Sequence, residues 1–391
     1  MDGFAARASR RPPVIKVLHV FKTFFPDTYG GIEQVVRTLA ENAAAQGIDC
    51  RVLVLSPQGS STTVEPSGYT LIRCQTTVNV ASTGFSWAFF HQFRQHADWA
   101  DIVHVHYPWP FIDLTVLLRG CKTPMVMTYH SDIVNQTRLE RFYAPLRDWF
   151  LRKQKRIVAT SPNYAASSPI LQTYTQKLSV IPIGIAAAEP APAAHEIARW
   201  RHLLGEKYFI FIGVPRYYKG LSYLLQAMKG RNYPLAIVGD GGDRADLERL
   251  ACALDLTGIR FLGALSEADK NAVLMGARAM VLPSHKRSEA YGIVLAEASA
   301  MGVPMITCEI GTGTSFVNLH EQTGLVVAPQ DPEALGVALD RMWTDDAAVA
   351  QWCKSARERY AAHFDALIMA QRYDEVYRDL FSFRTEEASV D

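Results

Sequence analysis

Short apolar segments alternate with longer amphipathic segments in the first half of the chain. Apolar runs that predict β-strands lie at 14–21, 51–55, 101–106, 125–130, 156–160 and 178–181. Between the first two of these runs, 31–46 has the apolar spacing of a helix that ends at Gly47. Short apolar strands joined by helices form a parallel sheet with helices on both faces. Residues 14–185 therefore predict one Rossmann-like α/β domain.

The same alternation restarts after a change in composition near residue 186. Ala, Pro and Glu dominate 186–194, so we interpret 186–204 as a linker. Further strands are predicted at 208–213, 235–239, 259–262, 279–283 and 304–308, with helices at 221–229, 244–254, 267–276 and throughout 332–383. This pattern predicts a second Rossmann-like domain at 205–365, which faces the first, and a C-terminal helix at 366–391. Parallel sheets bind ligands at the carboxyl ends of their strands, so the cleft between the domains is the expected site.

Length, charge and cysteine spacing narrow the class of protein. A chain of 391 residues is too long for a single core, and its net charge of +1 gives no overall field for nucleic acid. The six cysteines are scattered, which argues against a zinc ribbon or disulfide scaffold and favours a reducing compartment. The first 13 residues lack the apolar core of a signal peptide, and no apolar run approaches the ~20 residues of a membrane span. We therefore expect a cytoplasmic protein whose membrane contact, if any, is peripheral.

One stretch, SEAYGIVLAEASAMGVPMI at 288–306, combines a helix start with two carboxylates. The free N–H groups at the start of a helix attract anions, and a phosphate is the expected ligand. Glu289 lies in the loop before this helix, and Glu297 lies about 12 Å further along it. Glu297 can accept hydrogen bonds from a ribose diol, and Glu289 can contact a sugar. The alternative for Glu297 is an ordinary solvated helix residue.

Three other features follow predicted strands. Arg216 and Lys219 come after the strand at 208–213, where two cations suit a diphosphate, although a solvated basic turn is the alternative. Gly30 and Gly31 open the helix at 31–46, where backbone can approach a ligand closely, or they form a plain turn. His130 ends the strand at 125–130 and could contact substrate.

The remaining histidines near predicted strands, and the acidic residues, decide whether a further substrate contact or a metal site is expected. Asp132 lies beside His130 and could contact substrate with it, whereas His104 and His106 lie within a strand and read as structural. No H-E-x-x-H motif or cluster of acids occurs, so we expect no catalytic metal and no cofactor.

The segment 138–156 carries seven Arg or Lys and two acids, with four aromatic residues between them. Such a segment can lie on an anionic membrane surface. The alternative is a solvated helix whose aromatic side chains belong to the core.

Together these motifs resemble the retaining glycosyltransferases of the GT-B fold, specifically family 4. The E-x7-E motif from Glu289 to Glu297, within PSHKRSEAYGIVLAEASAMGVPMI, carries most of the resemblance. The segments RYYKGLSYLL, VGDG and CEIGTGTSFVN are similar to those of bacterial mannosyl- and rhamnosyltransferases of O-antigen synthesis. The resemblance implies two facing domains, with the last helices packed back on the first.

The resemblance also implies a role for each site residue. Glu297 would hold the ribose, while Arg216 and Lys219 would bind the diphosphate as it leaves. The Gly30–Gly31 loop would approach that diphosphate from the other domain. Glu289 and the backbone N–H groups of Tyr291, Gly292 and Ile293 would position the sugar and phosphate, and His130 would contact the donor sugar.

The implied reaction moves a mannosyl or rhamnosyl unit from a nucleotide-diphosphate sugar to a glycan or lipid-linked glycan, with retention of configuration. The resemblance favours GDP as the nucleotide and leaves UDP open. Since no residue is an evident nucleophile, we hypothesise a front-face displacement. The alternatives are a nucleotide-sugar 2-epimerase on the same fold, or a non-catalytic protein that binds a sugar nucleotide.

Overall fold

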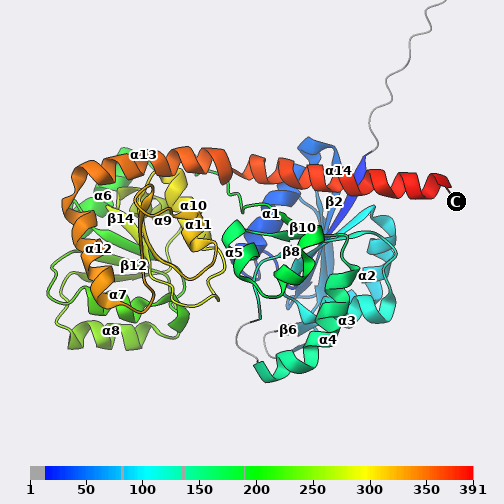
Figure 1. Ribbon diagram of the computed structural model, residues 1–391, viewed down its shortest axis with the longest axis horizontal. Coiled ribbons are helices and arrows are strands. Elements are labelled where there is room, and N and C mark those ends of the chain that lie inside the picture. Colours follow the sequence, from blue (N-terminus) through cyan, green and yellow to red (C-terminus); the bar gives the residue numbers. More distant parts are fainter. Residues whose placement is uncertain (1–13, 81–82, 134–136, 189, 391) are drawn as a thin grey trace, which may run out of the picture.

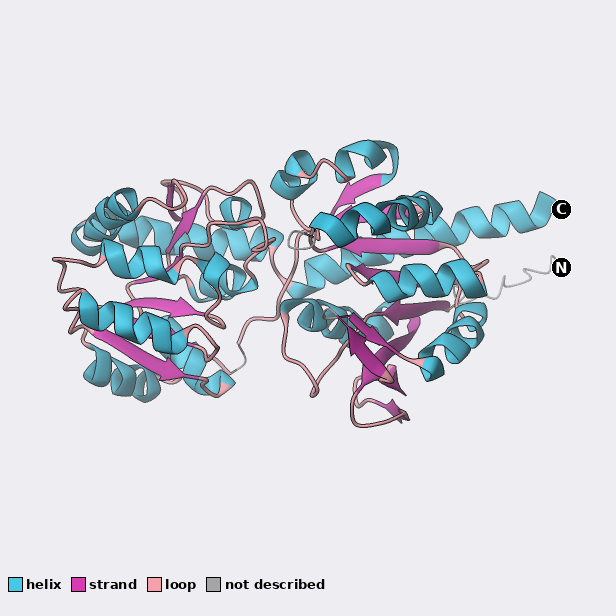
Figure 2. Cartoon of the chain, turned by 90° about the horizontal axis from the view of Figure 1, so that it is seen from below, coloured by secondary structure: helices cyan, strands magenta, loops and turns pink. Residues whose placement is uncertain are grey.

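Two α/β domains lie side by side along the longest axis of the molecule (Figure 1). This computed structural model describes residues 14–80, 83–133, 137–188 and 190–390. The predicted N-terminal tail, 1–13, lies outside these ranges, as does the last residue of the predicted C-terminal helix. In both domains parallel strands are covered by helices on both faces (Figure 2), as the alternating pattern predicts.

The N-terminal domain is built on an eight-stranded sheet in the order β10-β9-β8-β7-β1-β2-β4-β3, in which β3 alone is antiparallel to its neighbour. Its strands are β1 Ile15–Val20, β2 Ile48–Ser56, β3 Ser61–Val64, β4 Thr70–Gln75, β7 Ile102–Tyr107, β8 Met125–Tyr129, β9 Arg156–Ala159 and β10 Leu178–Val180, with a separate hairpin of β5 Val78–Val80 and β6 Thr83–Phe85. Its helices are α1 Gly31–Ala43, α2 Trp87–Trp99, α3 Pro110–Arg119, α4 Thr137–Lys153 and α5 Pro162–Ser167, with 3₁₀ turns Ala44–Gln46 and Leu171–Lys177.

The C-terminal domain has a parallel six-stranded sheet in the order β13-β12-β11-β14-β15-β16. Its strands are β11 Phe209–Ile212, β12 Leu235–Val238, β13 Ile259–Gly263, β14 Ala279–Leu282, β15 Met305–Cys308 and β16 Gly324–Val327. Its helices are α6 Ala194–Leu204, α7 Leu221–Ala227, α8 Arg244–Ala253, α9 Glu267–Gly276, α10 Ile293–Met301, α11 Thr314–Val317, α12 Pro332–Thr344 and α13 Asp346–His363, with a 3₁₀ turn at Tyr217–Lys219. The chain reverses direction across the sheet between β11 and β14, as it does between β1 and β7. Ligands of open α/β sheets bind at such switch points.

The linker is shorter than the composition predicts. Within the interpreted linker, 194–204 forms α6, which packs against α9 and belongs to the C-terminal domain. Trp200 and Leu204 lie four residues apart on the buried face of this helix. The Glu196 carboxylate accepts the backbone N–H of Ala193 at 2.7 Å, which fixes the first turn of the helix. Burial of the apolar pair and this cap explain why an Ala-rich segment is helical rather than extended.

The chain crosses between the domains twice, and the two crossings are hydrogen-bonded to each other. Ile185 donates its backbone N–H to Phe364 at 2.9 Å and accepts that of Ala366 at 3.0 Å. These contacts lie at the predicted domain limits of 185 and 365. From there α14, Ala366–Val390, runs back along the N-terminal domain (Figure 1). Its Tyr373 and Tyr377 are buried against the first sheet, so the helix is part of that domain's core.

The pattern of apolar residues missed the strands whose faces are not both buried. All four residues of β3 are exposed, and β4 mixes buried and half-buried positions. β3 is the edge strand, and β4 lies between it and β2. Neither has the continuous apolar run that marks a strand inside a parallel sheet, so neither was predicted.

Candidate active site

A cavity of about 610 Å³ lies between the carboxyl ends of the two sheets. It is lined by the residues to which the resemblance gives a role: Gly30, Gly31, His130, Arg216, Lys219, Glu289, Tyr291, Gly292, Ile293 and Glu297. These residues come from four separate segments of the chain, at 30–31, 130, 216–219 and 289–297. The fold therefore brings together a set of residues that the sequence could only nominate one by one.

Lys219 and Glu289 form the closest ion pair of the cavity. The Nζ–Oε2 distance is 2.6 Å, and both side chains are largely buried. The Ser284 hydroxyl also donates to Oε2, at 3.2 Å. Burial disfavours the charge of Lys219, but Glu289, together with Tyr218, outweighs this effect and raises the pKa of the ammonium. Lys219 therefore stays positive on the cavity wall.

Gly220 allows the chain to bring Lys219 to this position. Its φ of 71° lies in the left-handed region, and a Cβ there would meet the Pro283 carbonyl oxygen at 2.1 Å. Glycine avoids both the strain and the clash. The loop after β11 can therefore pack directly on the loop after β14, which carries Glu289.

Glu297 is paired with a cation that the sequence did not nominate. Lys270, in α9, lies 3.1 Å from its carboxylate and also 2.9 Å from Glu267. Burial raises the pKa of Glu297, and Lys270 opposes that effect. Glu297 is thus a partly buried acid on the cavity wall rather than the solvated helix residue of the alternative.

The first turns of α1 and α10 meet across the cavity. A Cβ on Gly31 would come within 2.7 Å of Ile293 Cδ1, so the two helix starts are in contact only because residue 31 is glycine. The first N–H groups of both helices have no partner within their own helix. Two positive helix ends therefore face the same space, which favours an anion between them.

Glu33 shapes the loop that precedes α1. Its buried carboxylate accepts the hydroxyls of Thr23 at 2.8 Å and Thr28 at 2.7 Å. Its Oε2 also lies 2.4 Å from the place where a Cβ on Gly30 would stand. Glu33 holds the loop in place, and a Cβ at position 30 would displace its carboxylate. Sequence analysis missed Glu33 because it appeared as an ordinary helix residue.

His130 begins a line of hydrogen-bonded histidines below the cavity. Its Nε2 lies 3.1 Å from His106 Nδ1, and His106 Nε2 lies 3.1 Å from His19 Nδ1. Burial lowers the pKa of His130 to about 3. The ring is therefore neutral at physiological pH and can donate or accept a hydrogen bond without carrying charge.

His104 is held separately, by hydroxyl groups. Its Nδ1 lies 2.6 Å from the Tyr377 hydroxyl, and its Nε2 lies 2.7 Å from Thr128. Nitrogens of His19, His104 and His106 all fall within 4.8 Å of one another. Both nitrogens of His104 already have hydroxyl partners, so the three rings act as a hydrogen-bonded core. The expectation of a metal-free, cofactor-free site stays a prediction.

Lys22 is a further cavity residue that the sequence did not nominate. It follows β1 and lines the cavity together with Arg216. Burial lowers the pKa of Lys22, and Arg216 lowers it further, while Glu33 opposes the shift. The signal in the sequence was a lysine directly after a buried strand, the same signal that identified Lys219.

Two nominated residues have additional or different contacts. The Tyr291 side chain is buried, and its hydroxyl donates to the Ile183 carbonyl at 3.0 Å. Asp132 is absent from the cavity wall and pairs instead with Arg287 of the other domain at 3.2 Å.

The basic segment 138–156 forms most of α4, and its side chains at 138–141 lie outside the described residues. Phe150 is fully buried, Tyr143 donates to buried Asp113, and Trp149 packs partly against the core. Phe142 is 86% exposed. Most of the aromatic side chains therefore belong to the core, and a membrane contact through this helix stays a prediction.

Comparisons with known proteins match this geometry. A family model described as glycosyl transferases group 1 matches residues 194–359, and one described as Glycosyltransferase Family 4 matches residues 29–189. A D-rhamnosyltransferase, WbpZ, of Pseudomonas aeruginosa is 45% identical over 90% of this chain and 93% of its own length. The chain belongs to the family 4 glycosyltransferases. It is therefore an enzyme that transfers a sugar, rather than the epimerase or non-catalytic binding protein of the alternatives.

Further relatives agree with this assignment. O-antigen chain mannosyltransferase C of Escherichia coli is 39% identical over 95% of the chain and 100% of its own length. Among solved structures, sucrose-phosphate synthase of Thermosynechococcus elongatus superposes with a TM-score of 0.78 at 22% identity, over 94% of this chain and 99% of that one. HepE of Anabaena, in complex with UDP, superposes with a TM-score of 0.76 at 17% identity, over 93% and 100%. These structures confirm the GT-B fold.

Proposed function

We propose that this glycosyltransferase moves a mannosyl or rhamnosyl unit from a GDP-linked donor to a glycan or lipid-linked glycan during synthesis of a surface polysaccharide. The names of the two relatives that cover nearly the whole chain support the sugar and the pathway. The arrangement of charge in the cavity supports a nucleotide-diphosphate sugar as the donor.

The observation that carries the proposal is a pair of ion pairs on either side of the start of α10. Glu289, before this helix, pairs with Lys219, and Glu297, within it, pairs with Lys270, while Arg216 lines the same cavity. A donor placed along these two pairs would set its ribose hydroxyls on Glu297 and its diphosphate beside Arg216 and Lys219. Its sugar would then lie between Glu289 and His130.

A second cavity supports an acceptor site on the N-terminal side. It has a volume of about 700 Å³ and shares Lys22, Tyr29, Gly30, Glu33 and Arg216 with the first. Its remaining lining includes the polar residues Thr23, Asp27, Thr28, Thr76 and Asn79. Hydroxyl, amide and carboxylate groups of this kind bind the hydroxyl groups of a sugar. An acceptor glycan there would meet the donor near the residues that the cavities share.

We propose that transfer retains the anomeric configuration by a front-face displacement. The bond between the anomeric carbon and the diphosphate oxygen breaks, and the acceptor hydroxyl oxygen bonds to that carbon from the same side. The proton of the acceptor hydroxyl passes to the leaving diphosphate. Lys219, Arg216 and the start of α10 would stabilise the charge that grows on the diphosphate. Neutral His130 would donate or accept a hydrogen bond at the sugar.

A transfer assay tests the proposed function. The purified protein is incubated with GDP-mannose, GDP-rhamnose or UDP-glucose and with a lipid-linked glycan acceptor. Proton NMR then gives the configuration of the first product. We expect transfer from a GDP-linked donor with retained configuration. Transfer from UDP-glucose alone would overturn the assignment of the nucleotide, and an inverted product would exclude the front-face displacement.

We also propose that the enzyme works on the cytoplasmic face of the membrane, since a lipid-linked acceptor must be reached there. No helix in the described part of the chain is long and apolar enough to cross a bilayer. The basic residues of α4 and the exposed ring of Phe142 would provide a peripheral contact. Sedimentation with vesicles that contain anionic lipid tests this, and equal binding to neutral vesicles would contradict it.

A further inference from the structure

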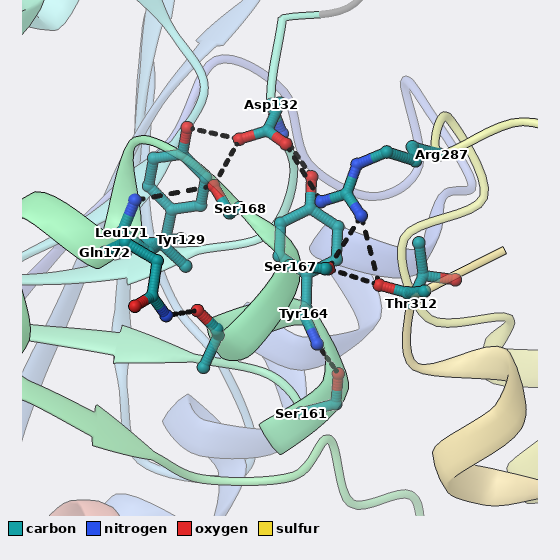
Figure 3. Close-up of polar contacts among 12 residues, drawn as sticks. Tyr129, Asp132, Ser161, Tyr164, Ser167, Ser168, Leu171, Gln172, Arg287 and Thr312 are labelled. Atoms are coloured by element: carbon teal, nitrogen blue, oxygen red, sulfur yellow. Dashed lines mark hydrogen bonds and ion pairs between the residues drawn. The ribbon is translucent and has the colours of Figure 1, made fainter.

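A polar cluster joins the two domains outside the cavity, and one arginine lies at its centre (Figure 3). Arg287, in the loop after β14, donates through Nη2 to Asp132 Oδ2 at 3.2 Å. Its Nη1 donates to the Ser167 hydroxyl at 2.7 Å and to the Gly311 carbonyl at 3.1 Å. Asp132 and Ser167 belong to the N-terminal domain, whereas Gly311 belongs to the same domain as Arg287. The guanidinium therefore bonds to both domains at once.

The N-terminal part of the cluster is held by hydrogen bonds within its own domain, without Arg287. Asp132 Oδ1 accepts the Tyr129 hydroxyl at 2.9 Å and the Ser168 hydroxyl at 2.8 Å. The backbone N–H of Asp132 donates to the Tyr164 hydroxyl at 2.6 Å, and Tyr129 and Tyr164 are both buried. These bonds leave Oδ2 as the oxygen that faces the other domain. A preset acceptor of this kind costs little further ordering when a cation binds.

Arg287 is also well placed to act as a clamp. Its guanidinium lies 4.7 Å from the centre of the Tyr164 ring, in a cation–π arrangement. The Arg287 and Asp132 side chains are 29% and 15% exposed, so solvent screens the pair only in part. The Ser167 hydroxyl donates to the Gly311 carbonyl as well, which adds a second direct bond between the domains.

The positions of the two charged residues link the cluster to the reaction. Asp132 follows His130 by two residues, and Arg287 precedes Glu289 by two residues. Each therefore lies in the same loop as one proposed sugar-contacting residue of its own domain. Neither Asp132 nor Arg287 lines the cavity. The pair therefore lies beside the cavity, next to the lining residues Ser131 and Ser288.

We propose that Arg287 and Asp132 are positioning residues that clamp the closed state of the enzyme. The ion pair holds the His130 loop and the Glu289 loop at a fixed separation, and it keeps the cavity closed to water while sugar is transferred. This inference rests on the proposed transfer reaction. The added point is that an ion pair outside the sugar site fixes the distance between the two loops that form it.

Two conservative substitutions separate the clamp from general stability. Asp132→Asn keeps an oxygen for Tyr129 and Ser168 but replaces the oxygen that receives Arg287. Arg287→Lys keeps the charge but loses the fork that reaches three acceptors at once. Arg287→Ala removes all of these contacts, and Arg249→Ala is the matched control, because Arg249 forms an exposed ion pair with Asp246 within α8.

The test measures transfer and hydrolysis of GDP-mannose for each variant. We expect kcat to fall about tenfold or more in Arg287→Ala and Asp132→Asn, with KM for the donor changed by less than about threefold, because the positioning of bound substrate is lost. The kcat of Arg287→Lys should lie between the values for these two variants and that of the wild type. The fraction of donor hydrolysed rather than transferred should rise. The double variant should lose no more than Arg287→Ala alone, since both remove one interaction.

Small-angle X-ray scattering of the same proteins without donor tests the clamp independently of the substrate. We expect a larger radius of gyration for Arg287→Ala and Asp132→Asn than for wild type and Arg249→Ala. Equal radii, strictly additive losses in the double variant, or equal losses in Arg249→Ala would each overturn the clamp. If the wild type transfers no sugar from GDP-mannose, the proposed donor fails, and the scattering result still decides whether the pair holds the domains together.

Discussion

The two domains meet the same cavity with different chemistry. The C-terminal side presents charged groups, with Arg216, Lys219, Glu289 and Glu297 on the loops and helix that follow its strands. The N-terminal side presents glycine backbone and the neutral ring of His130. Lys22 and Glu33 are exceptions on this side: burial lowers the pKa of Lys22, and the Glu33 carboxylate accepts the hydroxyls of Thr23 and Thr28. Under the proposed function, the C-terminal side would bind the charged nucleotide diphosphate, and the N-terminal side would supply mainly uncharged contacts to the sugar and the acceptor.

The largest expected loss comes from the charged side. Lys219→Ala should lower kcat by about 100- to 1000-fold, because it removes a fixed positive group from the place where the leaving diphosphate gains charge. Steady-state kinetics at saturating donor measure this loss. Lys229→Ala, at an exposed position after α7, is the control that should leave kcat unchanged. If Lys219→Ala raised KM for the donor and left kcat unchanged, the proposed role would be wrong.

The next largest effect is on nucleotide binding. Glu297→Ala should weaken GDP binding by about 10- to 100-fold, since hydrogen bonds to a charged group contribute about 1.5–3 kcal/mol. Titration calorimetry with GDP measures the change. Glu333→Ala, an exposed acid in α12, is the matched control. Unchanged affinity in Glu297→Ala would place the ribose elsewhere.

The same residue predicts a dependence on pH. Burial raises the pKa of Glu297 above its usual 4.5, so its carboxylate gains a proton as the pH falls through this raised value. Affinity for GDP should therefore decrease toward acidic pH in the wild type. The Glu297→Gln variant should lack this part of the decrease, because its amide does not titrate. An identical pH profile for the two proteins would contradict the assignment.

A smaller loss is expected from the neutral side. Gly31→Ala places a methyl group 2.7 Å from Ile293 Cδ1 and should hinder closure of the domains. Overpacking costs about 1–3 kcal/mol, so kcat/KM should fall about tenfold. Ile293→Val in the same protein should restore part of the rate by removing that carbon. Gly242→Ala, where a methyl group meets nothing within 4 Å, should have no effect. Failure of the Ile293→Val rescue would argue against this contact.

The smallest expected effect concerns stability of the N-terminal domain. Tyr377→Phe leaves the buried Nδ1 of His104 without its hydroxyl partner, at a cost of about 1–3 kcal/mol. For a domain of this size that lowers the melting temperature by about 2–4 °C per kcal/mol. Differential scanning calorimetry measures the shift, with Tyr29→Phe, whose ring is 79% exposed, as the control. Equal melting temperatures would show that α14 is not held through this pair.

The sequence predicted the charged wall more completely than the neutral one, for a physical reason. Arg216, Lys219 and Glu289 each follow a short apolar strand, so a polar side chain there stands out against its neighbours. The neutral wall depends on partners across the fold. The line from His130 to His106 and His19 joins three adjacent strands, and histidines inside strands look structural until the pairing is known.

Contacts between distant segments also could not be predicted from the sequence. Lys270 and Glu297 are 27 residues apart, and Arg287 and Asp132 are 155 residues apart. Nothing in the local pattern links either pair. The linker was predicted to be too long, because its composition alone extended it over 194–204, which forms helix α6. The spacing of Trp200 and Leu204 was the available signal for a buried helix face there.

A crystal structure with GDP bound tests the central claim most directly. The account predicts that the diphosphate lies beside the Arg216 guanidinium and the Lys219 ammonium, next to the start of α10, with the ribose hydroxyls on Glu297. Density for the diphosphate outside this wall, or a ribose without contact to Glu297, would contradict the division of labour between the two domains.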